Sequence, residues 1–273
     1  MSKIATDMSL LNFNQHISLK SKDELGKLAE SINTLSENLK ISMERLEKDI
    51  LFQKTLSRNL SHQLKTPIAI IKGHIEGLIY SVADTPDEKN RYVNIIVNEC
   101  DRLDSIIKEM LTLSRLYIYD EKSLNFEIFD FDIIYNDINS RFSSIFKSNN
   151  IKFKIQKLEN IYIKGNPDLI YHAISNYISN AIKYGNGEIK LIINKDNKNI
   201  IISVFNSGKN IPQNELENIF EPFYKLNYAR KNNESSHGLG LAIVQSIAKI
   251  DKGKAYAENC DKGIIFKIEI PSP

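Results

Sequence analysis

The sequence predicts an α+β protein in which a long helical hairpin is followed by a sandwich of helices on a sheet. Apolar residues recur at helical spacing from residue 25 to residue 113. From about residue 124 the pattern changes to short runs rich in Ile, Phe and Tyr. The 273 residues are enough for about two ordinary domains. We divide the chain into residues 1–47, 48–119 and 120–273.

The composition is that of a folded protein and excludes several classes of function. Hydrophobic residues make up 42% and charged residues 26%, and the net charge is only +2. This balance gives no reason to expect a nucleic-acid surface. No run of 18 apolar residues occurs, and Cys100 and Cys260 do not suggest a disulfide framework. We expect a soluble chain, the cytosolic part of a longer protein that reaches the membrane only through a missing N-terminal segment.

The first helical stretch carries a seam of apolar residues. Their spacing of three and four residues is heptad-like and favours a parallel contact with a second chain. An ordinary amphipathic helix that packs within its own domain remains the alternative. The seam residues are Leu25, Leu28, Ile32, Leu35, Leu39, Met43, Leu46 and Ile50.

A second helix is expected after residue 85. Thr85 is a good N-cap, Pro86 suits the first helical position, and Glu88 completes a capping box. Two helices joined by a short loop make a hairpin, and two hairpins make a four-helix bundle in a homodimer. We expect dimerisation through residues of about 22–118.

The rest of the chain predicts helices that cover one face of a sheet. Helices are expected at Phe131–Lys147, Pro167–Tyr184 and Gly240–Ile250. The segment Asn227–Ser236 is polar and without periodicity, so we expect a mobile loop. Strands are expected at Phe126–Phe129, Ile151–Ile155, Glu188–Ile193, Ile200–Phe205, Lys254–Glu258 and Ile264–Ile270.

The string Ser61-His62-Gln63-Leu64-Lys65-Thr66-Pro67 is the first candidate for chemistry. His62 falls on the polar face of its helix, and Thr66 lies one turn further on. An imidazole with a pKa of about 6.5 is largely neutral in the cytosol and can attack a phosphoryl group. A lone histidine on such a face is usually only solvated, so a functional role for His62 depends on the residues around it.

A second candidate is the predicted helix containing Asn176 and Asn180. Their spacing places both amides on one face, and amide oxygens are hard ligands that suit Mg²⁺. Lys183 can meet phosphate charge, and Tyr184 can cover an adenine. Because the chain is rich in Asn, the pair alone is weak support.

Three further segments lie in the last third of the chain. Gly238 and Gly240, in His237-Gly238-Leu239-Gly240-Leu241, allow backbone to approach phosphates at a helix N-terminus. A predicted strand is followed by Asn206-Ser207-Gly208-Lys209-Asn210-Ile211. This string fits a binding loop, and it fits a simple turn equally well. Taken without its context, the string Phe220-Glu221-Pro222-Phe223-Tyr224 indicates a core aromatic cluster. No Walker-type phosphate loop occurs.

These strings, in this order, resemble the boxes of bacterial sensor histidine kinases of two-component systems, over nearly the whole chain. Asp23-Glu24-Leu25-Gly26 with the following seam resembles the second half of a HAMP signal-relay module, which assigns residues 1–47. The resemblance implies an ATP-binding domain of the GHKL or Bergerat type in residues 120–273. It also implies phosphorylation of His62 with ATP and Mg²⁺, and transfer to an aspartate of a response regulator.

The resemblance also implies roles for single residues. Thr66 would position the water that dephosphorylates the regulator. Asn180 would be the direct metal ligand, with Asn176 beside it. The residues implied in ATP binding are Asn176, Asn180, Lys183, Tyr184, Asn206, Gly208, Ile211, Phe220, Phe223, Gly238, Leu239, Gly240 and Leu241.

Three departures from the family pattern leave rivals open. Gln63 stands where an acidic general base is usual, Asn206 where an aspartate accepts from adenine, and Ser236 where a glycine is frequent. Gln63 can hydrogen-bond an imidazole but cannot take its proton. One rival is a degenerate kinase that acts as an ATP-dependent phosphatase or scaffold. Another is a clamp-type ATPase in which His62 is incidental.

Overall fold

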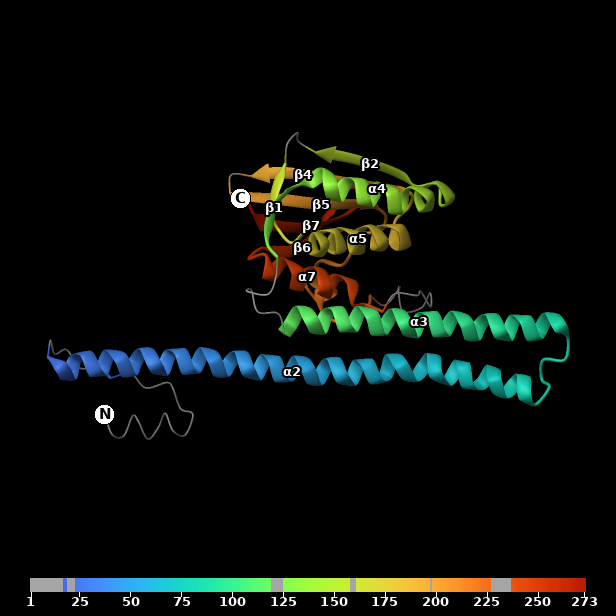
Figure 1. Cartoon of the computed structure of the whole chain (residues 1–273), viewed down its shortest axis with the longest axis horizontal. Helices are drawn as coiled ribbons and strands as arrows, with labels where there is room; N and C mark the ends of the chain where they lie inside the picture. Colours follow the sequence, from blue (N-terminus) through green and yellow to red (C-terminus); the bar gives the residue numbers. More distant parts are fainter. Residues whose placement is uncertain (1–16, 19–22, 119–124, 158–160, 197, 227–236) are drawn as a thin grey trace. The chain divides into compact units, whose positions relative to one another are not determined.

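The computed structural model describes residues 17–18, 23–118, 125–157, 161–196, 198–226 and 237–273 (Figure 1). The chain forms two compact units, residues 1–63 and 64–273, and each is described by itself. The predicted loop Asn227–Ser236 and most of the segment before Asp23 lie outside the described residues.

Two long helices follow the expected hairpin pattern. Helix α2 spans Glu24–Ile79 without interruption and contains Pro67. Asp23 caps its start, because its carboxylate accepts from the backbone N–H groups of Leu25 and Gly26 at 3.1 and 3.0 Å. Several seam residues, Leu25, Leu28, Leu35, Leu39, Leu46 and Ile50, are exposed in the single chain.

Helix α3 spans Pro86–Ile118 and confirms the predicted capping box. The backbone N–H of Glu88 donates to the hydroxyl of Thr85 at 3.3 Å. In return, the carboxylate of Glu88 accepts from the backbone N–H of Thr85 at 3.2 Å. Among the described residues, no helix is long and apolar enough to cross a bilayer.

The C-terminal region contains two sheets. Strands β1 (Glu127–Asp130) and β3 (Tyr162–Gly165) form an antiparallel pair. The larger sheet has the order β2-β4-β5-β7-β6, in which β2 is parallel to β4 and the other pairs are antiparallel. Its strands are β2 (Lys152–Lys157), β4 (Glu188–Asp196), β5 (Asn199–Ser207), β6 (Lys254–Cys260) and β7 (Gly263–Pro271).

Three helices cover one face of the larger sheet (Figure 1). They are α4 (Phe131–Ser148), α5 (Pro167–Tyr184) and α7 (Gly240–Ile250). Two short turns, η2 (Gln213–Glu215) and η3 (Asn218–Phe220), lie between β5 and α7. Each helix and strand expected in this region is confirmed within a few residues at its ends. Strand β3 was not predicted, because two of its four residues, Lys164 and Gly165, are of types depleted in strands.

Alternating buried residues of β4, together with the nearly continuous buried run of β5, build the core. In β4, Ile189, Leu191 and Ile193 are buried, while their neighbours are more exposed. Tyr177 of α5 is fully buried over Phe266 of β7, with ring centroids 5.4 Å apart. Each fully buried Ile or Leu stabilises the fold by about 1.5–3 kcal/mol. The polar end of Tyr177 is satisfied as well, since its hydroxyl donates to the Lys267 carbonyl at 2.9 Å.

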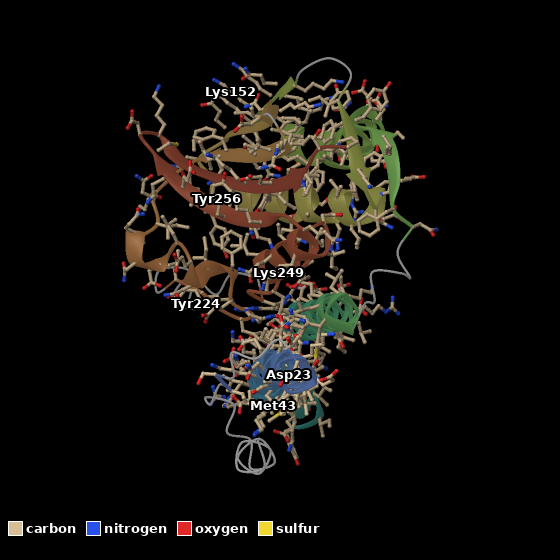
Figure 2. The ribbon with its side chains drawn as sticks, turned by 90° about the vertical axis from the view of Figure 1, so that its left-hand side faces the viewer. Asp23, Met43, Lys152, Tyr224, Lys249 and Tyr256 are labelled. Carbon is tan, nitrogen blue, oxygen red and sulfur yellow. The ribbon has the colours of Figure 1, made fainter. Side chains whose placement is uncertain are left out.

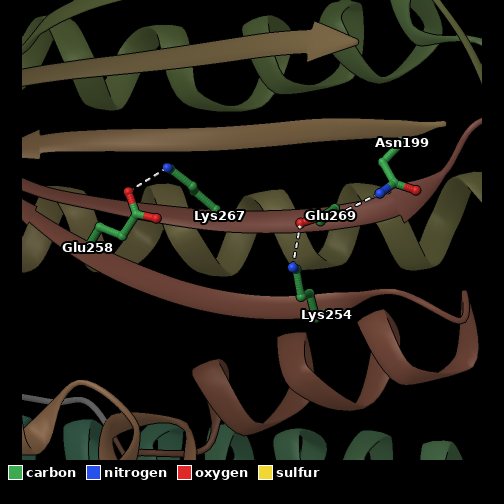
Figure 3. Close-up of polar contacts among 5 residues, drawn as sticks. All are labelled: Asn199, Lys254, Glu258, Lys267 and Glu269. Atoms are coloured by element: carbon green, nitrogen blue, oxygen red, sulfur yellow. Dashed lines mark hydrogen bonds and ion pairs between the residues drawn. The ribbon is translucent and has the colours of Figure 1, made fainter. Parts of the chain in front are cut away.

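The opposite face of the sheet carries polar side chains (Figure 3). The carboxylate of Glu269 accepts from the amide of Asn199 at 2.6 Å and pairs with the ammonium of Lys254 at 3.1 Å. Lys267 donates to Glu258 at 2.5 Å. Figure 2 shows the two layers side by side, with Tyr256 on the sheet and Lys249 on α7.

One buried carboxylate in the helical layer has no partner. Asp251 caps the end of α7 through its backbone, but its side chain is only 6% exposed and neither carboxylate oxygen accepts a hydrogen bond. Burial alone raises the pKa of Asp251 to about 7. Since the folded chain then holds this proton more tightly than the unfolded chain, stability falls as pH rises from about 4 to about 7.

Replacing Asp251 with Asn should therefore remove a pH dependence. Between pH 5 and pH 8 we expect the wild type to lose about 2–3 kcal/mol of stability that Asp251→Asn keeps. Urea unfolding followed by circular dichroism at the two pH values measures the difference. The exposed Asp196→Asn provides the matched control. Equal pH slopes for the wild type and Asp251→Asn would contradict the assignment.

Candidate nucleotide site

A pocket lies in the second unit where α5, the turns after β5 and the start of α7 meet. Its wall combines polar residues with apolar residues from strand β7. Among the residues expected from the sequence, it brings together Asn176, Asn180, Lys183, Tyr184, Ile211, Gly238, Gly240 and Leu241. It also includes residues the sequence did not single out as binding residues, namely Glu109, Ser179, Lys209, Ile219, Tyr224, Lys225, Leu226, His237, Ile264 and Phe266.

Helix α5 positions the two asparagines at one side of the pocket. Asn166 caps this helix by accepting from the Leu169 N–H at 3.1 Å, and Pro167 occupies the first turn. The amide of Asn176 donates to the His172 carbonyl at 3.1 Å, so its own oxygen is directed away from the helix backbone. Asn176 and Asn180 are both half-buried, which lets ligand reach them while their positions are fixed.

The start of α7 approaches the side chain of Asn176 closely at Gly240. A Cβ atom added at Gly240 would lie 2.9 Å from Oδ1 of Asn176. Leu239 precedes the helix and provides no side-chain cap, so the first N–H groups of α7 stay available. An anion next to Asn176 would accept from these groups and be stabilised by the helix dipole.

Gly238 connects the phosphate-facing loop to the aromatic segment. Its φ of +74° lies in the left-handed region, and an added Cβ would be 2.8 Å from the Tyr224 carbonyl oxygen. The N–H of Phe223 donates to the Gly238 carbonyl at 2.8 Å. Tyr224, labelled in Figure 2, hydrogen-bonds Glu215 through its hydroxyl. The aromatic segment thus fixes one end of the loop through its backbone.

Other predicted residues lie beside the pocket and do not line it. Leu239 and Phe220 are buried core residues, and Gly208 and Phe223 shape the adjoining turns. Asn206 is 3% exposed, and its Oδ1 has no hydrogen-bond partner. Its strand position pairs it with Ile264, which does line the pocket.

His237 was quoted in the sequence string but given no role of its own. It is 3% exposed, and neither ring nitrogen makes a hydrogen bond. Its Nδ1 lies 3.6 Å from a carboxylate oxygen of Glu109 on α3. Nearby, burial lowers the pKa of His172, an effect that the Glu109 charge opposes and the Arg141 charge reinforces. The burial of His237 beside Gly238 is visible only in the structure, because the sequence does not show which side chains are buried.

The residues of this pocket fit a nucleotide with a bound cation. Asparagine oxygens, Lys183 and the N-terminus of α7 suit phosphates, whereas Ile211, Ile219, Ile264 and Phe266 suit a base. Among the described residues, no cluster of three His, Cys, Asp or Glu could hold a metal. Mg²⁺ does not require such a cluster, because it is usually held by one or two protein oxygens together with phosphates and water.

The residues of the predicted phosphotransfer site lie on α2, with His62 and Gln63 in the first unit and Thr66 in the second. His62 and Thr66 are exposed, as the sequence predicts, and Gln63 is half-buried. The hydroxyl of Ser61 donates back to the Ser57 carbonyl at 3.0 Å. The imidazole of His62 therefore projects from a regular helix and is open to an incoming group.

Three protein families match the chain in succession. Residues 1–41 match the HAMP domain, and residues 52–116 match the His Kinase A (phospho-acceptor) domain. Residues 165–273 match the histidine kinase-, DNA gyrase B- and HSP90-like ATPase family.

Sensor proteins are among the curated relatives. The chain is 26% identical over 260 residues to the sensor histidine kinase CssS of Bacillus subtilis, covering 95% of this chain and 54% of CssS. It is 30% identical over 263 residues to the sensor protein VanSB of Enterococcus faecalis, covering 93% of this chain and 58% of VanSB. The chain thus spans little more than half the length of these relatives.

Solved histidine kinases share its fold. The Acinetobacter baumannii histidine kinase AdeS is 26% identical, with a TM-score of 0.63, over 77% of this chain and 98% of that one. The histidine kinase ThkA, solved in complex with the response regulator protein TrrA, is 27% identical, with a TM-score of 0.65, over 86% of this chain and 66% of that one. The order of the three families and these likenesses show that the chain belongs to the sensor histidine kinases of bacterial two-component systems.

Proposed function

We propose that the protein is an ATP-dependent protein-histidine kinase that phosphorylates His62 and passes the phosphoryl group to an aspartate of a response regulator. The carrying observation is an exposed His62 in the matched phosphoacceptor region of a chain that also holds a pocket suited to ATP. The ThkA relative, solved with the regulator TrrA, supports a partner of that class.

Phosphoryl transfer makes few covalent demands on the protein. A nitrogen of His62 attacks the γ-phosphorus, its bond to that phosphorus forms as the Pγ–O bond to ADP breaks, and the imidazole proton leaves to solvent. Lys183 and the first N–H groups of α7 stabilise the phosphate oxygens. Bound Mg²⁺ would supply charge neutralisation, held by Asn180 with Asn176 beside it.

Replacing His62 with Gln tests the acceptor. With γ-labelled ATP, the wild type should gain an acid-labile label, and His62→Gln should lose it completely while still binding ATP. His74 lies in the same helix and provides the control, since His74→Gln should keep the label. Undiminished label in His62→Gln would reject His62 as the acceptor.

Replacing Asn180 with Ala tests the metal assignment. Loss of the ligand should reduce ATP affinity in the presence of Mg²⁺ by about 10–100-fold, as expected when an oriented metal site is disturbed. Affinity measured in EDTA should change little. The exposed Asn194→Ala controls for general effects of the substitution. If Asn180→Ala weakens binding equally with and without Mg²⁺, the residue does not serve the metal.

A second function is favoured by one observation, the amide at Gln63. An amide cannot take the proton that an acidic residue takes at this place, and general-base help is worth about 10²–10⁴-fold. An ATP-binding phosphatase of the response regulator, or a signalling scaffold, is this second candidate. ATP binding without any label on His62, together with accelerated dephosphorylation of a labelled regulator, would select the phosphatase. ATP binding with neither would select the scaffold.

We further propose that two copies associate through α2 and α3 as a four-helix bundle. Exposed apolar side chains at heptad spacing support this, because such a seam is rarely left in water. The proposed regions remain residues 1–47 for the partial HAMP module, 48–119 for dimerisation and phosphotransfer, and 120–273 for ATP binding. The chain would form the cytoplasmic part of a membrane-anchored sensor, which fractionation of the full-length protein would test.

A charge placed in the seam should weaken the dimer. Leu46 is 53% exposed in the single chain, and Leu46→Glu would desolvate two carboxylates on association. We expect the dissociation constant to rise by about 10–100-fold. Sedimentation equilibrium over a concentration series measures it, with Lys48→Glu off the seam as the control. A wild type that is monomeric at every concentration would remove the proposal.

A further inference from the structure

The side-chain amide of Asn206 is a buried polar group near the pocket whose hydrogen bonding is incomplete within the chain. It is 3% exposed, and its oxygen has no hydrogen-bond partner within the chain. Leaving a buried polar atom unpaired is costly, so such an atom beside a pocket indicates a ligand that completes it. Ile264, directly opposite Asn206 in the register of β5 and β7, lines that pocket.

Through its strand partner Ile264, Asn206 lies beside the end of the pocket that suits a base. The phosphate-binding groups lie at Asn176, Lys183 and the start of α7, which leaves the end near Ile211 and Ile264 for a planar apolar group. Gly185 and Gly263 crowd Asn206 on its other sides. A Cβ at position 185 would lie 3.4 Å from Cβ of Asn206, and a Cβ at 263 would lie 2.1 Å from its backbone carbonyl oxygen. Glycine at both positions thus lets the neighbouring segments pack closely against Asn206.

In the part of the chain that the structure describes, no acidic side chain lines this end of the pocket. Among the described residues that line the pocket, Glu109 is the one acidic side chain, and it lies at the His237 side. A carboxylate accepts hydrogen bonds only, whereas an amide accepts through its oxygen and donates through its nitrogen. Rotation about the terminal side-chain bond exchanges the two, since that torsion is broad and nearly two-fold.

Purines differ at the atom such a group would contact. Adenine presents an amino donor at position 6, whereas guanine and hypoxanthine present a carbonyl acceptor there. An acidic residue would satisfy the donor and repel the acceptor. Asn206 can satisfy either, by turning its oxygen or its nitrogen toward the base.

We propose that this pocket accepts 6-oxopurine nucleoside triphosphates, ITP and GTP, as phosphoryl donors alongside ATP, and that Asn206 permits this breadth. The proposal rests on the proposed function, because it assumes that a nucleoside triphosphate occupies the pocket. In place of a kinase restricted to adenine nucleotides, it predicts one that responds to the total pool of purine triphosphates.

Competition binding and labelling by the full chain test the proposal. ITP is the sharpest probe, because it differs from ATP at position 6 and in the proton on N1 but lacks the additional amino group of GTP. Wild-type affinities for ATP and ITP, measured by displacement of a fluorescent ATP analogue, should agree within about 10-fold, and both γ-labelled nucleotides should label His62. Asn206→Asp should weaken ITP relative to ATP by about 10–100-fold.

The same exchange at an exposed position, Asn194→Asp, should leave the affinity ratio unchanged. A wild type that binds ITP more than about 100-fold more weakly than ATP would overturn the proposal. A folded Asn206→Asp with an unaltered ratio would do the same. If Asn206→Asp does not fold, the wild-type ratio decides alone. ATP labelling without ITP labelling rejects only the broad specificity, whereas failure of both nucleotides to bind rejects the proposed function as well.

Discussion

The burial of α5 and α7 against one face of the five-stranded sheet is the constraint on which the pocket depends. Isoleucines of β4, β5 and β7 form a continuous apolar surface, and both helices bury their apolar stripes on it. With both helices fixed to the same surface, the middle of α5 and the first turn of α7 come close together at Asn176 and Gly240. The ligand-facing groups thus owe their geometry mainly to apolar packing.

The sequence predicted the elements of this fold well, for reasons visible in single segments. The alternation in β4 and the 3.6-residue pattern in α5 are long and regular, so neither could be mistaken. The capping box at Thr85 and Glu88 fixed the start of α3 to the residue. Strand β3 was missed because half of Tyr162–Gly165 consists of lysine and glycine, and only its pairing with β1 holds it extended.

Parts of the pocket could be predicted and parts could not. Asn176 and Asn180 lie one helical turn apart in a short motif, so the sequence alone indicated that they share a face, whereas only the family resemblance implied Gly240 beside them. Ile264 and Phe266 belong to a strand near the C-terminus, and only the sheet order brings them beside α5. Leu239 was expected at the ligand by its place between two glycines, yet it is fully buried in the core. Local sequence identifies motifs, whereas the partners that complete a pocket come from tertiary packing.

The edge of the larger sheet has a consequence for the protein in a crowded cell. Strand β6 lies at one edge, where unpaired backbone groups could recruit a strand from another molecule. Its side chains Lys254 and Glu258 are engaged in ion pairs with β7, which place charge along that margin. Charge along a sheet edge disfavours the addition of a further strand. The proposed self-association would then use the helical seam, where pairing can be reversible and can carry a signal.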